Sequence, residues 1–369
     1  MKNSRIKFNI FSCISTFARS LIEIFISLYL FKNGFSIKFI LLFYLLENIF
    51  AIFLSYIFVR IGEKYKYSII MYIGVISFII LQVVLNNTVN SISYIFLISF
   101  LYSVYRRGYW VSRRFYLTNI ISQNNSSESF SVILISTQLS SIISGYLGAI
   151  LLDSFSVSLL TVISSFLLFI SVLPLTTIKY NNTNTKIELI KNIKKYDKRN
   201  YLAFSLFELD NLLIFIFTIY IAIYVQSSYV MAGSINAISN IAIIIFIFIY
   251  GKIIRKKNYF VLSSILFIIM CVTKLFLYNY LILVIYFFEG IVKVMQNQSV
   301  NKIYFENRNG MDLTHYNLIY QLLESITRAV VVFPLLFMNN IRIMIMFVMF
   351  VISVELFIYN NMKKSNKLR

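Results

Sequence analysis

The sequence predicts an all-α integral membrane protein with twelve transmembrane helices in two parallel-repeat six-helix bundles. Of 369 residues, 59% are hydrophobic and 13% are charged, whereas a soluble domain carries about 25% charged residues. Apolar stretches long enough to cross a bilayer recur along the whole chain, and Lys and Arg gather in every second connection. This composition excludes a soluble enzyme, a disordered chain and a nucleic-acid-binding domain, despite the net charge of +20.

Each membrane span is predicted from an apolar stretch of about 20 residues, with only 10 Gly and 2 Pro in the chain to interrupt them. In the first half the spans are predicted at 8–31, 37–59, 66–86, 93–116, 129–152 and 156–178. In the second half they are predicted at 201–225, 229–250, 259–278, 280–303, 313–338 and 342–360. The first stretch carries Arg19 and Glu23 and lacks a small-residue cleavage site, so it is interpreted as a membrane helix and not as a signal peptide.

The basic residues predict the orientation of the chain. They occur in both termini and in alternate connections, above all in the central one, while the intervening connections hold only Lys32, Lys38 and Arg342. An excess of Lys and Arg marks the cytoplasmic side. The sequence therefore predicts a multi-pass protein of the cell (plasma) membrane with cytoplasmic N- and C-termini. The expected partner of the positive charge is the anionic inner leaflet of the bilayer, not nucleic acid.

A polar stretch near the middle divides the spans six and six. We expect an N-terminal six-helix bundle at 1–179, a cytoplasmic linker at 180–200, a C-terminal six-helix bundle at 201–360 and a cytoplasmic tail at 361–369. The region around Arg19 aligns weakly with that around Asp210, and the region around Arg114 with that around Lys302. An even number of spans per half gives both halves the same orientation, as in a parallel repeat.

The connection after the second span carries the remnant of a known motif. Arg60, Gly62 and Lys64 follow Ser55 in a pattern similar to Gly-x-x-x-Asp-Arg-x-Gly-Arg-Arg, without the acid. With its two six-span halves and basic central loop, the chain resembles the transporters of the major facilitator superfamily (MFS). The resemblance implies alternating access, a conformational role for the motif remnant, and a central cavity lined by spans one, four, seven and ten.

Two glycines of the fifth span admit two interpretations. Gly145 and Gly148 are spaced as in a loose version of the antiporter motif of the MFS, but without its proline. The alternative is that these small residues allow close packing of neighbouring helices.

Charged residues inside the spans predict the cavity, because each costs at least about 2.5–3.5 kcal/mol in the hydrocarbon core and usually faces a bundle interior or water. They concentrate in spans one, four, seven and ten. The substrate-cavity candidates are Arg19, Arg106, Arg107, Glu289, Lys293, Glu324 and Arg328. Spans three, six, nine and twelve, expected to face lipid, have no charge near mid-membrane, and Lys274 and Glu355 are predicted to reach the interface from span ends.

The spacing of these charges leaves two roles open. Arg19/Glu23, Glu289/Lys293 and Glu324/Arg328 stand four residues apart, so each pair either neutralises itself on one helix face or serves substrate and protons. The candidates for proton coupling are Asp210, Glu208, Glu47 and Glu23. For Glu208 and Asp210 the alternative is an interhelical salt bridge to Arg19 or Arg106. For Arg106 and Arg107 the alternatives are anion binding and snorkelling toward the cytoplasmic leaflet.

The predicted function is secondary transport of a small polar, zwitterionic or amphipathic organic solute, coupled to protons, with export favoured by analogy. We expect no enzyme activity, no cofactor and no metal, because the chain has one histidine and two cysteines within apolar runs. No oligomer is required. The alternatives are a polytopic cell-surface polysaccharide polymerase, a lipid-linked flippase, or a non-transporting membrane sensor. The absence of a long outer connection in the sequence argues against the polymerase.

Overall fold

The computed structural model describes residues 2–121, 126–155, 157–178, 198–225, 228–256, 259–276, 281–306 and 313–365. Within these ranges the chain is helical, and a helix covers each of the twelve predicted spans. The predicted all-α, MFS-like fold class is confirmed. The expected linker at 180–200 lies outside the described residues, except for its last three, which already belong to a helix.

The first span is broken into α1 (Lys2–Ser20), the 3-10 turn η1 (Glu23–Phe25) and α2 (Ile26–Lys32). The other helices of the first half are α3 (Ile37–Lys64), α4 (Tyr67–Leu85), α5 (Ile92–Ile121), α6 (Ser126–Ser154) and α7 (Val157–Thr176). Those of the second half are α9 (Lys198–Tyr224), α10 (Tyr229–Lys256), α11 (Phe260–Phe276), α12 (Ile282–Glu306), α13 (Leu313–Leu335) and α14 (Ile341–Ser365). The last helix therefore continues into the expected tail at 361–369.

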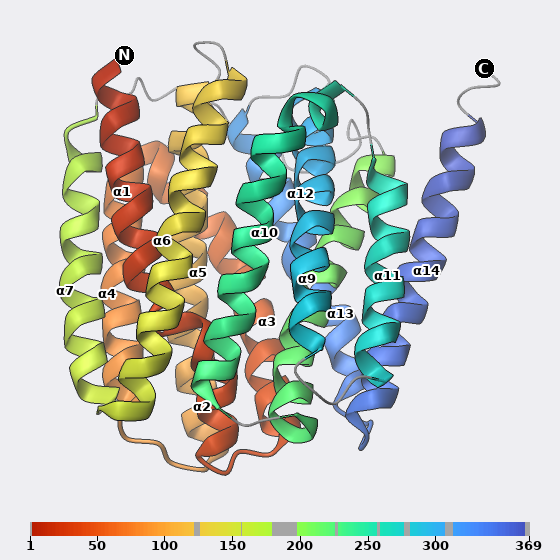
Figure 1. Ribbon diagram of the computed structural model, residues 1–369. Coiled ribbons are helices and arrows are strands. Elements are labelled where there is room, and N and C mark those ends of the chain that lie inside the picture. Colours follow the sequence, from red (N-terminus) through yellow and green to blue (C-terminus); the bar gives the residue numbers. More distant parts are fainter. Residues whose placement is uncertain are drawn as a thin grey trace.

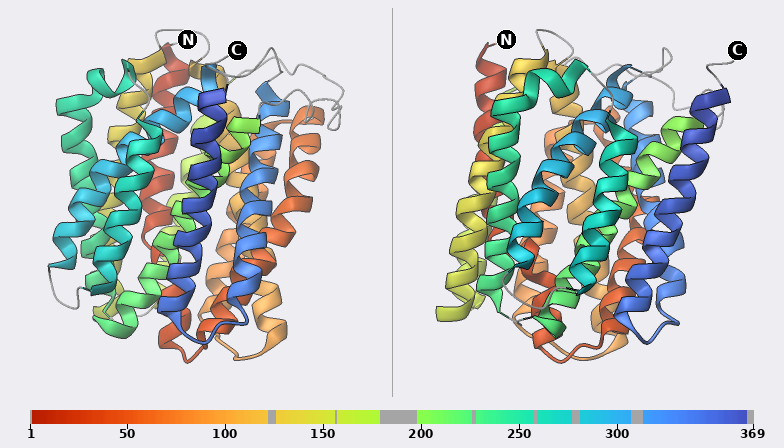
Figure 2. Two further views of the ribbon diagram at one scale, coloured as in Figure 1. Left: turned by 90° about the vertical axis from the view of Figure 1, so that its right-hand side faces the viewer. Right: turned by 45° about the vertical axis from the view of Figure 1, so that its right-hand side comes forward.

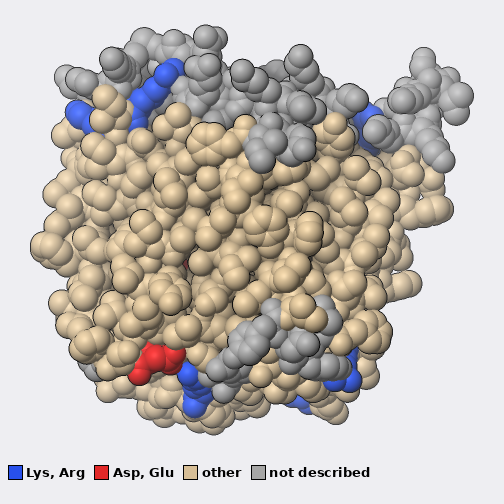
Figure 3. Space-filling model, in the orientation of Figure 1, with Lys and Arg blue, Asp and Glu red and all other residues tan. Residues whose placement is uncertain are grey.

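The helices stand side by side as one bundle, in which the start of α1 and the end of α14 lie on the same face (Figures 1 and 2). This face is called the terminal face below, and the other end of the bundle the far face. On the side shown in Figure 3, the charged side chains of the described residues lie near these two faces, and the band between them is almost entirely uncharged. Large apolar side chains such as Phe53, Phe166 and Phe350 are exposed on the helix flanks, as expected for surfaces that contact lipid.

Within the described residues, nine helices are long and apolar enough to cross a membrane by length and composition alone. The other three are α5, α11 and α12. Helix α11 is apolar but has only 17 residues. Helices α5 and α12 carry several charged and polar residues within their length, so their apolar character is diluted where they face the interior of the bundle.

The turn between the first two spans shows how the sequence ends one helix and begins the next. Gly34 has a φ of +83°, which suits glycine, and the Phe35 amide donates to the Leu30 carbonyl at 3.1 Å. This is the usual arrangement at a helix C-terminus. Ser36 then caps α3 by accepting a hydrogen bond from the Phe39 amide at 3.4 Å. A connection this short holds the two helices together at the far face.

Close packing explains the paired glycines of α6. A Cβ on Gly148 would lie 2.5 Å from the Leu21 carbonyl oxygen, and a Cβ on Gly233 of α10 would lie 2.9 Å from the Gly145 carbonyl oxygen. Gly148 therefore lets the Leu21 backbone approach, and Gly233 lets the α6 backbone approach at Gly145, which favours the packing interpretation over the antiporter motif.

The motif remnant ends α3 and does not form a separate loop. Arg60 is exposed and donates from Nε to the Tyr56 hydroxyl of its own helix at 3.2 Å. The Lys64 ammonium lies 5.3 Å from the Tyr65 ring centroid. Gly62 is buried, and a Cβ there would lie 2.5 Å from the Tyr67 ring at the start of α4. The described contacts of the remnant are thus local ones between α3 and α4.

Candidate substrate cavity

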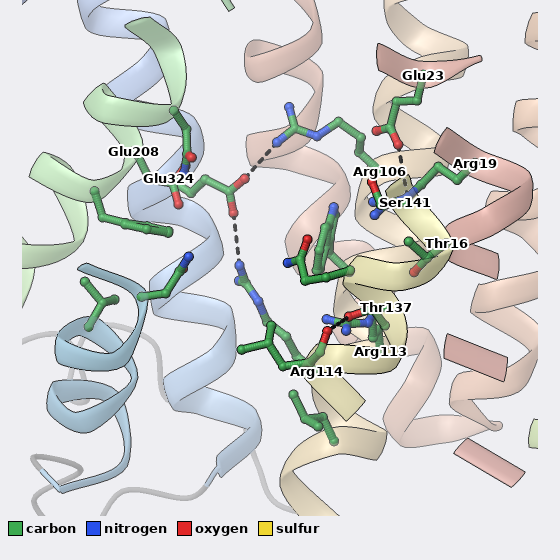
Figure 4. Close-up of a pocket in the computed structure, with 18 of the residues that line it drawn as sticks. Thr16, Arg19, Glu23, Arg106, Arg113, Arg114, Thr137, Ser141, Glu208 and Glu324 are labelled. Carbon is green, nitrogen blue, oxygen red and sulfur yellow. Dashed lines mark hydrogen bonds and ion pairs between the residues drawn. The ribbon is translucent and has the colours of Figure 1, made fainter. Parts of the chain in front are cut away.

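A cavity of about 680 Å³ lies between the two halves of the bundle (Figure 4). Its walls come from the α1–η1 region, α5 and α6 of the first half and from α9, α12 and α13 of the second half. The charged residues that line it are Arg19, Glu23, Arg106, Arg113, Arg114, Glu208, Glu324 and Arg328. Six of the eleven predicted coupling and cavity residues are among them, whereas Glu47, Arg107, Asp210, Glu289 and Lys293 are not.

The cavity occupies the half of the bundle nearer to the terminal face. Its lining on α5 runs from Arg106 to Leu117, close to the helix end on that face, and its lining on α6 runs from Ile133 to Ser141. Toward the far face the two halves touch. Tyr44 of α3 packs on Phe215 of α9 with ring centroids 3.7 Å apart.

A second contact between the halves joins Phe25 of η1 to Tyr229 of α10, whose ring centroids lie 5.7 Å apart. The Lys32 ammonium also lies 3.8 Å from the Tyr229 ring centroid. Aromatic side chains thus separate the cavity from the far face.

The first membrane helix is interrupted beside the cavity. Leu21 and Ile22 form a turn between α1 and η1, and Gly148 leaves room for the Leu21 backbone. Across this break the Arg19 Nε lies 3.1 Å from a Glu23 carboxylate oxygen. Glu23 also accepts hydrogen bonds from Tyr102 at 3.0 Å and Tyr105 at 3.4 Å, so this predicted pair is neutralised within the first half.

Glu324 of α13 is surrounded by four arginines, of which Arg106 and Arg114 are labelled in Figure 4. Its carboxylate oxygens lie 2.9 Å from Arg106, 3.4 Å from Arg107, 3.5 Å from Arg114 and 3.4 Å from Arg328. The first three belong to α5 of the other half, while Arg328 follows Glu324 by one helical turn. Glu324 thus joins the two halves at the cavity wall.

The buried positions of Arg106 and Arg107 argue against one of the two alternatives left open for them, snorkelling toward the cytoplasmic leaflet. Arg106 is 8% exposed and Arg107 is 1% exposed. Arg106 binds Glu324 and, on its other side, Glu47 of α3 at 2.9 Å. Glu47 had no partner on its own helix, and the structure supplies one from α5.

Glu208 of α9 also pairs within its own half. Its carboxylate forms an ion pair with Arg328 and accepts a hydrogen bond from the Tyr320 hydroxyl at 3.1 Å. Both partners lie on α13. The predicted alternative, a salt bridge from Glu208 to Arg19 or Arg106, is therefore wrong.

A separate charged cluster lies inside the second half. Glu289 of α12 binds Lys274 of α11 and lies 3.3 Å from Lys293 on its own helix. Lys274 is fully buried, with its ammonium 3.8 Å from the Tyr286 ring centroid. The prediction that Lys274 snorkels from a span end is wrong, because its side chain turns inward to Glu289.

The other charged residue expected at a span end, Glu355, also turns inward. Glu355 of α14 accepts a hydrogen bond from Ser205 of α9 at 3.0 Å. The two charges predicted on spans nine and twelve are therefore held by contacts within the protein.

Asp210 has a different environment from the other predicted acids. It is 3% exposed, and Gln296 of α12 donates a hydrogen bond to its Oδ2. Oδ1 is buried and has no hydrogen-bond partner in the described part of the chain. Glu23, Glu47, Glu208, Glu289 and Glu324 each contact an arginine or a lysine, whereas the partner of Asp210 is a neutral amide.

Trp110 of α5 stands at the centre of a group of arginines that sequence reasoning did not assemble. The guanidinium carbons of Arg19, Arg113 and Arg114 lie 5.2, 5.2 and 5.9 Å from its ring centroid. A helical spacing signals this wall, because Arg113 and Arg114 follow Arg106 and Arg107 by two turns on the same face. From the sequence alone they are not cavity candidates, because they stand at the end of the apolar stretch 93–116.

Comparisons with known proteins place this geometry in a family. The family model of the Major Facilitator Superfamily matches residues 8–330. Among solved structures, the in meso crystal structure of the POT family transporter PepTSo is similar, with a TM-score of 0.76 and 9% sequence identity. The match covers 99% of this chain and 98% of that one, and at this identity it shows a shared fold. The search of curated proteins returned no match.

Proposed function

Since this chain belongs to the major facilitator superfamily, we propose that it moves a small polar or amphipathic organic solute across the cell membrane by alternating access. The main support for this proposal is the cavity of about 680 Å³, whose charged walls come from both six-helix halves. In such folds a site at the interface becomes accessible from each side in turn as the halves rock. Membership of this family of secondary transporters, together with the transporter fold, argues against an enzyme.

The proposed orientation places the terminal face in the cytoplasm. The basic residues of the termini and of alternate connections support it. The cavity lies in the half of the bundle next to that face, and the aromatic contacts Tyr44–Phe215 and Phe25–Tyr229 lie on the other side of it. This conformation is accordingly the cytoplasm-facing one. Export remains the proposed direction, by analogy with compact members of the family.

Protons are the proposed coupling ions, and Asp210 is the proposed proton site. Because its partner is the neutral amide of Gln296, its carboxyl can gain or lose a proton without leaving an arginine or lysine unpaired. Burying an unpaired ionised carboxylate costs free energy, which the protonated form avoids. Asp210 stands on α9 two residues from Glu208, which lines the cavity, so movement of α9 would couple the two positions.

The test uses proteoliposomes that contain a pH-sensitive dye. Pools of small polar solutes, sorted by charge, are added with and without an imposed pH gradient. The wild type should show solute-dependent proton flux. Asp210→Asn should lose this flux while retaining solute exchange at equal pH, because binding does not need the proton. Glu355→Gln is the matched control, since Glu355 also has a neutral partner, Ser205, but lies on α14, which contributes no residue to the cavity wall. Unchanged proton flux in Asp210→Asn would contradict the proton role.

A further inference from the structure

The cavity wall around Trp110 carries more positive than negative charge. Five arginines and three glutamates line the cavity. Just behind the wall, Glu47 pairs with Arg106, and Arg107 adds a further guanidinium beside Glu324. The arginines therefore outnumber the carboxylates by two, whether or not these buried neighbours are included. The local field favours a ligand of negative charge.

The excess of positive charge at the cavity wall is greatest around Arg113. Within the described residues no carboxylate lies within ion-pair distance of it, and its buried Nε has no hydrogen-bond partner. The nearby charges that act on it are the guanidinium groups of Arg19 and Arg114. Arg19 has Glu23 and Arg114 has Glu324, whereas Arg113 has no carboxylate partner in the described part of the chain and lies 5.2 Å from the Trp110 ring centroid. A half-buried guanidinium whose Nε–H has no acceptor in the described part of the chain is a site for an external acceptor.

The rest of the cavity suits an organic ligand. Thr137, Gln138 and Ser141 of α6 supply neutral polar groups to the wall, and Ile133 and Leu134 supply apolar surface. The volume of about 680 Å³ lies within the range of sites for small organic molecules, about 300–1,000 Å³. A guanidinium binds a carboxylate or a phosphate through two parallel hydrogen bonds.

We propose that the substrate is a small organic anion whose carboxylate or phosphate group binds Arg113 beside Trp110. This inference rests on the proposed transport function and specifies its substrate class. The anion adds the acceptor that Arg113 lacks and offsets the repulsion among Arg19, Arg113 and Arg114. The organic part extends along α6 toward Ile133 and Leu134. A neutral or cationic solute would leave the positive charge uncompensated.

Trp110 supplies the measurement, because it is the only tryptophan in the chain. Its fluorescence in the purified full-length protein therefore reports on this site alone. Iodide should quench it more strongly than caesium, relative to free tryptophan, because the arginines attract the anion. Benzoate and phenyl phosphate should protect Trp110 from iodide with saturation, whereas the neutral benzamide should not. Equal quenching by the two ions, or equal protection by benzamide, would overturn the proposal.

Substitution of Arg113 tests the assignment to this residue. Arg113→Gln should weaken protection by benzoate at least about tenfold, as expected when a charged hydrogen-bond partner is lost. Arg113→Lys should keep the preference for iodide over caesium, and the exposed Lys38→Gln, which removes one positive charge at the start of α3, should match the wild type. If Arg113→Gln does not fold, the proposal is still tested by Arg113→Lys and by the comparison of benzoate with benzamide in the wild type.

Two further measurements distinguish a small organic anion from free phosphate and from a lipid headgroup. Inorganic phosphate and bilayers containing phosphatidylglycerol are tested in place of the organic probes. Protection by either that equals or exceeds that by phenyl phosphate would overturn the assignment to a small organic anion. The assay needs no pH gradient, so it is independent of proton coupling. If proton-driven flux occurs only with neutral or cationic solutes, the proposed substrate class is contradicted but proton coupling is not. If anions bind without proton flux, proton coupling is contradicted but the substrate class is not.

Discussion

Glu324 of α13 and Arg106 of α5 form an ion pair at 2.9 Å across the interface between the two halves. Arg106 also holds Glu47 of α3, so one guanidinium links two helices of the first half to one of the second. The Glu324 carboxylate in turn compensates Arg107, Arg114 and Arg328. A single acid therefore decides whether these positive charges can be buried together.

We predict that Glu324→Gln destabilises the protein by about 3–5 kcal/mol, the usual cost of leaving buried charge uncompensated. Thermal unfolding in detergent measures the effect. Glu355→Gln serves as the control, because Glu355 contacts the neutral Ser205. Adding Arg107→Gln to Glu324→Gln should restore part of the lost stability, because Arg107 pairs with Glu324 and not with Glu47. Purely additive losses would show that the two residues do not interact.

The buried pair Lys274–Glu289 yields a second prediction. Lys274→Met leaves Glu289 with Lys293 alone, and we expect a loss of about 3–5 kcal/mol. Lys274→Met combined with Glu289→Gln removes both charges and should be closer to the wild type, since no carboxylate is then left buried. The melting temperatures of the single and double variants provide the comparison. A double variant less stable than Lys274→Met would contradict the pairing.

The two glycines of α6 form a matched pair for a third prediction. An added methyl group at Gly148 meets the Leu21 backbone, with 2.5 Å to its carbonyl oxygen. At Gly145 the nearest atom is the end of the Asn236 side chain, which can move. Gly148→Ala should therefore lower the melting temperature and transport rate more than Gly145→Ala. Equal effects would mean that the break in the first helix tolerates displacement.

Access to the cavity gives a fourth prediction. In a background with Cys13→Ser and Cys271→Ser, Gln138→Cys of the cavity wall should react with a membrane-impermeant maleimide from the side of the terminal face. Tyr44→Cys, which lies among the contacts between the halves, should be protected. Intact cells and inside-out vesicles are compared, and labelling of Gln138→Cys mainly in intact cells would reverse the proposed orientation.

The sequence was sufficient for the fold and for the polar helix faces. Spans follow from local apolar length, and a spacing of four residues places Arg19 beside Glu23, Lys293 beside Glu289 and Arg328 beside Glu324 on single helices. These features depend only on helical geometry, so they could be predicted without knowledge of the tertiary structure.

The partners from other helices could not be predicted in this way. Lys274 turns inward because Glu289 stands opposite it on the adjacent helix. Glu324 contacts Arg106 and Arg107, which lie more than 200 positions earlier in the chain. Such contacts depend on how helices are rotated and shifted against one another. Hydropathy alone gives neither quantity, which is why the contact between Arg19 of α1 and Trp110 of α5 was not predicted.

The interruption of the first membrane helix gives its two parts unequal freedom. Helix α1, which ends beside Arg19, packs on α6 and α7, whereas α2 packs on α9 of the other half. The turn at Leu21 and Ile22 can act as a hinge, because fewer helical hydrogen bonds must break there. Opening of the far face would move α2 off α9, while α1 stays packed on α6 and α7 and keeps Arg19 near Trp110. A bound anion would then gain a path to the far side before its arginine partners separate.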